Sequence, residues 1–284
     1  MFEAPSTLPP DREQELAAYR EELRFRSLDA VEALLADVES DAAREQVYEL
    51  AFDPSRALPK RSQRPKLETL ALAEQLYLAH DPDGTDLATV CEFTVAVTEY
   101  YDIADDLVDG DVAPEDEDCV FLVLQVLLSL FVERLGRLGG DVVAYWSRRA
   151  RRLTGAPFGE RRQEPSLAAY LDILDLQAGL FGFVTGVSAL AAGAADDAVA
   201  RAERVGRRYY RCEQFVVDCR QHGREAGEPW NLYRFVDADE AASLLAAERS
   251  ALAAHLEGLP AERRERIRSL FAVDVAAVHE RHHG

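Results

Sequence analysis

Four aspartates recur at helical spacing inside an apolar stretch, and this pattern restricts how the stretch can fold. Because they stand at positions i, i+3, i+4 and i+7, one face of an α-helix would carry all of them. Like charges at this spacing destabilise a helix, so a neighbouring positive charge must offset the repulsion. A divalent cation such as Mg²⁺ is the usual partner of paired carboxylates. The stripe consists of Asp102, Asp105, Asp106 and Asp109.

A solvated acidic surface is the alternative interpretation of this stripe. The whole chain is acidic, with 52 Asp and Glu against 32 Lys and Arg and a net charge of −20, so acidic clusters are common in it. The stretch is flanked by apolar residues such as Val97, Ile103 and Leu107, however, which predicts a helix buried on part of its circumference. The apolar context favours a metal and diphosphate site over a solvated face.

Composition limits the class of protein. A length of 284 residues with 48% hydrophobic residues predicts one domain with a sizeable core. The longest apolar run, Val120 to Val132, is interrupted by Gln125 and Ser129, and the N-terminus has no signal-peptide pattern, so we expect a cytoplasmic protein without a membrane span. The four scattered cysteines are typical of reduced thiols.

The balance of charges adds two further expectations. Only two of the 32 basic residues are lysines, and excess acid with so little lysine indicates a halophilic cytoplasm, where acidic surfaces stay hydrated. A basic face large enough for nucleic acid is not visible in the sequence, so nucleic-acid binding is not expected.

Helical periodicity dominates the chain and strand-like alternation is nearly absent, which predicts a single all-α domain over residues 1–284. Long helices with apolar residues on several faces are typical of the interior of a bundle. We expect one or two helices over 11–50 and further helices over 65–79, 86–109, 119–138, 141–153, 166–192, 196–222, 239–257 and 260–282.

A cationic cluster precedes the helix expected at about residue 65. It contains both lysines of the chain, which makes it the least arbitrary basic segment of an acidic protein. Direct charge and the exposed N–H groups of a helix N-terminus together suit a diphosphate. A surface patch that balances the acidic charge is the alternative. The cluster consists of Lys60, Arg61, Arg64 and Lys66.

Taken in order, these segments resemble the polyprenyl synthetase family, the trans-isoprenyl diphosphate synthases. That family has a Gly-Lys-Arg-x-Arg-Pro segment, an Asp-Asp-x-x-Asp-type helix about forty residues later, and a second acidic motif opened by Gln-x-x-Asp-Asp. The resemblance covers about residues 55–235. The matching residues are Lys60-Arg61 with Arg64-Pro65, Glu92, Asp102 with Asp106, the 170–181 helix, Gln214 with Asp218, and Gly227-Glu228-Pro229.

The resemblance implies an isoprenoid-synthase-type helical bundle that forms a homodimer. It also implies Mg²⁺-dependent condensation of isopentenyl diphosphate with an allylic prenyl diphosphate. It implies that Asp102 and Asp106 are catalytic metal ligands. The further metal ligands that it implies are Asp105, Asp109 and Asp218. The diphosphate-binding residues that it implies are Lys60, Arg61, Arg64 and Gln214.

The chain departs from the family where the second acidic motif is expected. Val217 and Gln221 stand in place of carboxylates, Leu176 stands in place of a lysine, and Glu225 is a candidate replacement ligand. A non-catalytic paralogue, acting as subunit or regulator of a full-motif homologue, is therefore the alternative function. A terpene synthase or a squalene or phytoene synthase is a further alternative, since 105–109 matches the Asp-Asp-x-Val-Asp string of the latter.

Overall fold

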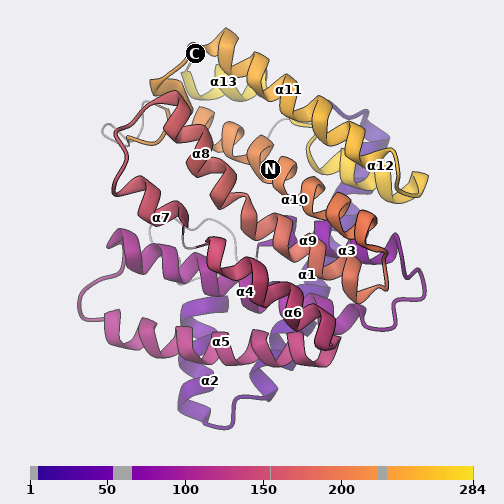
Figure 1. Cartoon of the computed structure of the whole chain (residues 1–284), viewed down its shortest axis with the longest axis vertical. Coiled ribbons are helices and arrows are strands. Elements are labelled where there is room, and N and C mark those ends of the chain that lie inside the picture. The colour runs from indigo at the N-terminus through magenta and orange to yellow at the C-terminus, as the bar shows by residue number, and fades with distance from the viewer. Residues whose placement is uncertain (1–5, 54–65, 154, 223–228, 284) are drawn as a thin grey trace.

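Helices make up almost all of the chain in the computed structural model, which describes residues 6–53, 66–153, 155–222 and 229–283 (Figure 1). Within these ranges no strand forms, and the one β-bridge joins Ser6 to Val273. The helices are α1 Pro10–Ala36, α2 Asp41–Val47, α3 Leu67–Leu78, α4 Leu87–Asp109, α5 Glu117–Leu138, α6 Gly140–Leu153, α7 Gly155–Glu160, α8 Leu167–Gln177, α9 Gly179–Ala191, α10 Asp196–Gln221, α11 Ala238–Leu256, α12 Ala261–Leu270 and α13 Val275–His283, with a π-helix Tyr48–Phe52 and a 3₁₀ turn Leu232–Arg234.

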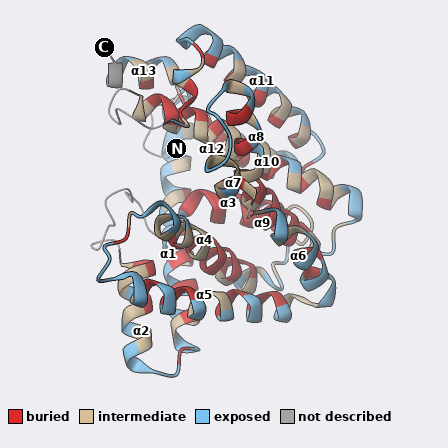
Figure 2. Cartoon of the chain, turned by 60° about the vertical axis from the view of Figure 1, so that its left-hand side comes forward, coloured by how far each residue is buried: buried red, intermediate tan, exposed pale blue. Residues whose placement is uncertain are grey.

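The all-α prediction is confirmed, and helix α9 lies at the centre of the bundle. It packs against α3, α6 and α10, and buried residues gather where α3, α4, α9 and α10 meet (Figure 2). Glycines allow this close packing. A Cβ atom at Gly182 of α9 would lie 2.7 Å from Cγ of Arg207, and one at Gly206 of α10 would lie 2.4 Å from the carbonyl oxygen of Phe181. Only glycine leaves room for two backbones at this separation.

The single helix expected over 166–192 is wrong in one respect, because the structure divides it at Ala178. Ser166 caps α8 by accepting a hydrogen bond from the backbone N–H of Ala169, and α8 ends at Gln177. Gly179 then begins α9, where a Cβ atom would lie 3.0 Å from Cδ2 of Leu153 on α6. Glycine has low helix propensity, which favours a break at this point. The pattern of apolar residues continues across Ala178, so the pattern alone does not predict the break.

The helix expected over 260–282 is also two helices, α12 and α13. Between them Phe271 and Val273 are buried, and Val273 pairs with Ser6. The short α7 was not expected, since six residues with two glycines and Pro157 give almost no periodic signal.

Two helical segments of the described chain are long and apolar enough to be membrane-span candidates by composition. They are Glu117–Leu138 and the segment Leu167–Ala191, which α8 and α9 form together, with 44% and 72% of their most apolar windows buried inside the bundle. Burial of this kind is typical of core helices in soluble proteins, so both are weak candidates.

A buried arginine ties α5 to the helices beside it. The Arg134 side chain is 1% exposed, and its nitrogens lie 2.7 Å from Oε2 of Glu92 on α4 and 2.6 Å from Oδ2 of Asp37, the residue that ends α1. It also donates a hydrogen bond of 3.3 Å to the carbonyl oxygen of Ala33. Glu92, which the family resemblance had singled out, is thus paired with Arg134 in the structure.

We expect Arg134→Met to lower the free energy of unfolding by about 3–5 kcal/mol, because removal of one partner leaves the buried Glu92 carboxylate uncompensated. The matched control is Arg137→Met on the same helix, whose side chain is 47% exposed and whose loss should cost about 1 kcal/mol or less. Urea unfolding of both variants measures the difference. Equal losses of unfolding free energy in the two variants would contradict the conclusion that the ion pairs of Arg134 hold α5 to its neighbours.

Candidate functional site

The four aspartates of the stripe lie in the last two turns of α4, as predicted. The helix ends at Gly110, which adopts a left-handed conformation with φ of 77°. Ile103 is buried, which fixes the orientation of α4, and leaves Asp102 and Asp106 half-buried while Asp105 and Asp109 are exposed. The C-terminal end of a helix carries partial negative charge, so carboxylates there are unfavourable without a positive partner.

Lys66 supplies positive charge to this stripe. It is the residue before α3, and its ammonium group forms an ion pair with Oδ1 of Asp102. The Asp102 side chain is 19% exposed and that of Lys66 is 42% exposed. Lys66, the residue of the basic cluster that the structure describes, thus meets the acidic stripe at Asp102, 36 residues further along the chain.

The surroundings of Asp105 raise the pKa of its carboxyl group. Loss of surrounding water and the negative charges of Asp109, Asp102 and Asp106 raise the pKa of the Asp105 carboxyl from 3.8 to about 6, while Lys66 opposes the shift. A raised pKa means that the folded chain tolerates the ionised form poorly. The stripe is therefore a region of excess negative charge that a cation would stabilise.

Asp218 of α10 is enclosed by hydrogen bonds. Its side chain is almost fully buried, and Oδ2 accepts from the Tyr170 hydroxyl and from the backbone N–H of Leu232, both at 2.7 Å. Oδ1 accepts from the Gln214 amide at 2.7 Å. These bonds anchor α8 and the segment after α10, so the geometry favours a structural role. Metal binding by Asp218 and diphosphate binding by Gln214 stay predictions.

Glu213 of α10 was not among the predicted residues. Burial raises the pKa of Glu213 to about 7, Glu68 adds to the rise, and the charge of Lys66 opposes it. Burial also raises the pKa of Tyr210 on the same helix, with smaller contributions from the charges of Glu213 and Asp105. Glu213 lies one helical turn before Val217, so a search on the same helix face could have found it.

The carboxylates of the stripe are oxygen donors of the kind that Mg²⁺ prefers. Four of them on one face of a helix suit a hard divalent cation. In the part of the chain that the structure describes, no three Asp, Glu, His or Cys side chains converge as a preformed metal site. The stripe of α4 fits the ion; α10, with Val217 and Gln221, does not supply a matching second stripe.

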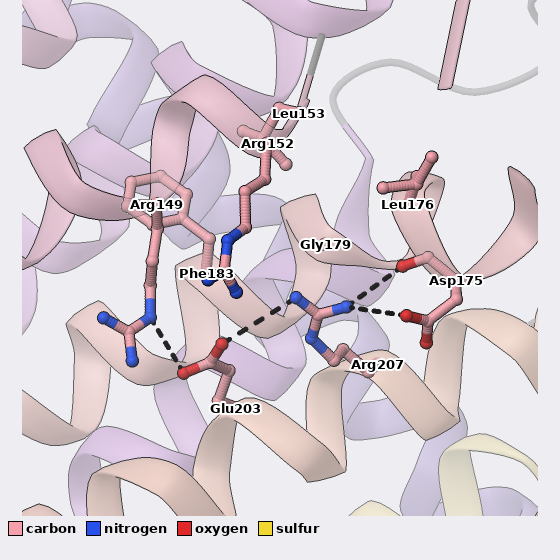
Figure 3. A pocket seen from close by; sticks show the side chains of 9 residues that line it. All are labelled: Arg149, Arg152, Leu153, Asp175, Leu176, Gly179, Phe183, Glu203 and Arg207. Atoms are coloured by element: carbon pink, nitrogen blue, oxygen red, sulfur yellow. Dashed lines mark hydrogen bonds and ion pairs between the residues drawn. The ribbon is translucent and has the colours of Figure 1, made fainter. Parts of the chain in front are cut away.

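The other predicted residues fall outside the described ranges or away from the stripe. Lys60, Arg61, Arg64 and Glu225 lie outside the described residues. Leu176 lines a cavity of about 150 Å³ between α6, α8, α9 and α10 (Figure 3). There Arg207 contacts Glu203 and Asp175, at 3.8 and 3.6 Å, and no residue of α4 lines this cavity among those described.

Comparison with known proteins gives a fold but no sequence relative. No protein-family model matches the chain, and no curated protein matches it. Among solved structures, it is similar to a geranyltranstransferase from Methanosarcina mazei, with a TM-score of 0.72, 12% identity, and coverage of 90% of this chain and 98% of that one. A geranylgeranyl pyrophosphate synthase from Corynebacterium glutamicum has a TM-score of 0.71 and 16% identity, with 95% of each chain covered.

A third structure adds information about ligands of its own. It is a polyprenyl synthase from Caulobacter crescentus complexed with calcium and isoprenyl diphosphate, with a TM-score of 0.67, 19% identity, and coverage of 95% of this chain and 97% of that one. At these identities the likeness establishes the fold. The chain has the all-helical fold of the isoprenyl diphosphate synthases, as the resemblance in sequence had implied.

We expect Asp105→Asn to raise the free energy of unfolding at pH 7. The wild-type carboxyl has a higher pKa folded than unfolded, so the folded protein loses stability as the pH rises from 3.8 to about 6. The advantage of the variant should grow over this window, stay level above it and vanish below about pH 4. Urea unfolding between pH 4 and 8 measures it, with the exposed Asp118→Asn as control. An advantage independent of pH would contradict the electrostatic explanation.

Proposed function

We propose that this protein is a Mg²⁺-dependent prenyltransferase that condenses isopentenyl diphosphate with an allylic prenyl diphosphate. The observation that carries the proposal is the stripe of carboxylates at the end of α4, which Lys66 faces within a bundle of this fold. The solved structures with the same fold are named as prenyl diphosphate synthases, and one of them was complexed with calcium and isoprenyl diphosphate.

The acidic side chains would hold the metal ion, and the basic side chains would hold the diphosphate groups. Asp102 and Asp106, one helical turn apart on α4, would hold Mg²⁺, with Asp105 and Asp109 beside them. When bound, the ion would neutralise the diphosphate that leaves the allylic substrate. Lys66 would add a positive charge at the same place. Lys60, Arg61 and Arg64 would hold the isopentenyl diphosphate, by the resemblance alone.

A non-catalytic subunit or regulator is the second candidate function. Val217 and Gln221 provide no carboxylates on α10, and the one aspartate nearby, Asp218, is enclosed by Tyr170, Gln214 and Leu232. A chain with one acidic stripe would then serve a partner with both. Turnover by the isolated protein separates the two functions.

We also propose a homodimer formed through α5. That helix exposes an apolar face while its other side packs on α4. Exposed fractions reach 63% for Leu122, 55% for Phe121 and 48% for Val132, and the exposed Gln125 and Ser129 share this side of the helix. Exposed apolar faces of this kind are typical of interfaces between subunits.

Turnover of radiolabelled isopentenyl diphosphate with dimethylallyl, geranyl or farnesyl diphosphate tests the proposed reaction, in high salt because of the acidic surface. We expect product from the wild-type protein with Mg²⁺. Asp102→Asn and Asp106→Asn should each lower kcat by about 100- to 1,000-fold, the usual effect of losing one electrostatic contact to the transition state.

The exposed Asp118→Asn, on α5, is the matched control and should keep full turnover. No product from folded wild-type protein with any of the three allylic substrates would refute the prenyltransferase. If product then formed only after addition of a full-motif homologue, the subunit function would replace it.

The dimer has its own test. Leu122→Glu should convert the dimer to a monomer, because it places charge in the centre of an apolar interface. Phe25→Glu is the matched control: Phe25 is 67% exposed on α1, a helix that packs on α3, α4 and α12, and its substitution should leave the dimer intact. Sedimentation equilibrium measures the mass. A monomeric wild-type protein would contradict the proposed interface.

A further inference from the structure

Lys66 lies beside the first carboxylate of the acidic stripe. It precedes the first turn of α3 with an extended backbone, and its side chain reaches across to Asp102 of α4. Asp102 is the first carboxylate of the stripe. The ammonium group therefore lies beside the start of the acidic stripe.

Stability of the fold does not account for this pair. Lys66 is 42% exposed, and partly exposed ion pairs contribute little to folding. The effect of Lys66 is therefore expected in the site itself, through the charge that the stripe can accept.

The scarcity of available carboxylates on α10 is consistent with a single positive charge from Lys66 at the site. Val217 and Gln221 are neutral, and Asp218 is engaged in hydrogen bonds from three groups. With fewer carboxylates on this part of α10, less positive charge is needed to balance the site. An ammonium group supplies one unit of positive charge without requiring further ligands.

We propose that Lys66 is a built-in counter-ion of the acidic stripe, which competes with a divalent cation for Asp102 and takes the place of one metal ion. The role of this charge in catalysis rests on the proposed function, but the competition itself does not. Lys66 holds Asp102 in the resting protein, and a metal ion must displace the ammonium group to use that carboxylate.

The test is metal binding by the full chain without substrate. Lys66→Gln keeps a polar side chain of similar reach but removes the charge, so Mn²⁺ binding, counted by electron paramagnetic resonance and confirmed with Mg²⁺ by calorimetry, should tighten about three- to tenfold. Lys66→Arg should bind Mn²⁺ as weakly as the wild type, because it keeps the positive charge.

Two controls separate this contact from a general effect of charge. Arg161→Gln removes a positive side chain that contacts the carbonyl oxygen of Val108 at the end of α4, and it should leave metal affinity nearly unchanged. In the double variant Lys66→Gln with Asp102→Asn, the gain should disappear. Lys66→Met, with a thermal melt for each variant, repeats the test if the glutamine variant folds poorly.

Unchanged or weaker metal binding in folded Lys66→Gln and Lys66→Met would overturn the inference, as would the absence of metal binding in every variant. Turnover is scored separately. A wild-type protein that makes no prenyl product, together with tighter metal binding by Lys66→Gln, would refute the proposed function and support the counter-ion.

Discussion

The repulsion among carboxylates at the negative end of α4 is the constraint on which the site depends. Asp106 and Asp109 lie in the last turn, where the helix itself is unfavourable to negative charge, and the pKa of Asp105 is raised to about 6. Positive charge beside such a stripe offsets part of this repulsion. Among the described residues Lys66 supplies it to Asp102.

The rest of the bundle brings the helices of the site together. Gly182 and Gly206 let the backbones of α9 and α10 approach, and Arg134 joins α5 to α4 through Glu92. Asp218 fixes the end of α10 through its hydrogen bonds. A carboxylate that in a second acidic motif would face a metal is thus part of the packing here.

Much of the fold could be predicted from the sequence, because long helices carry a strong periodic signal, as in α4 and α10. The break at Ala178 and the short α7 could not be predicted. The break depends on the packing of Gly179 against α6, and the six residues of α7 are too few to give a periodic signal. Within the site, the spacing of aspartates predicted the stripe of α4. The pairing of Lys66 with Asp102 and the position of Glu213 depend on how helices meet, which spacing along one helix does not record.

The most direct test of the central claim is where a metal ion binds. Crystals of the protein grown with Mn²⁺ and inorganic pyrophosphate would locate the ion by its anomalous scattering. The account predicts manganese on Asp102 and Asp106, with the ammonium group of Lys66 moved from Asp102 toward the pyrophosphate. Manganese bound elsewhere, or an intact pair of Lys66 and Asp102 beside a filled metal site, would contradict it.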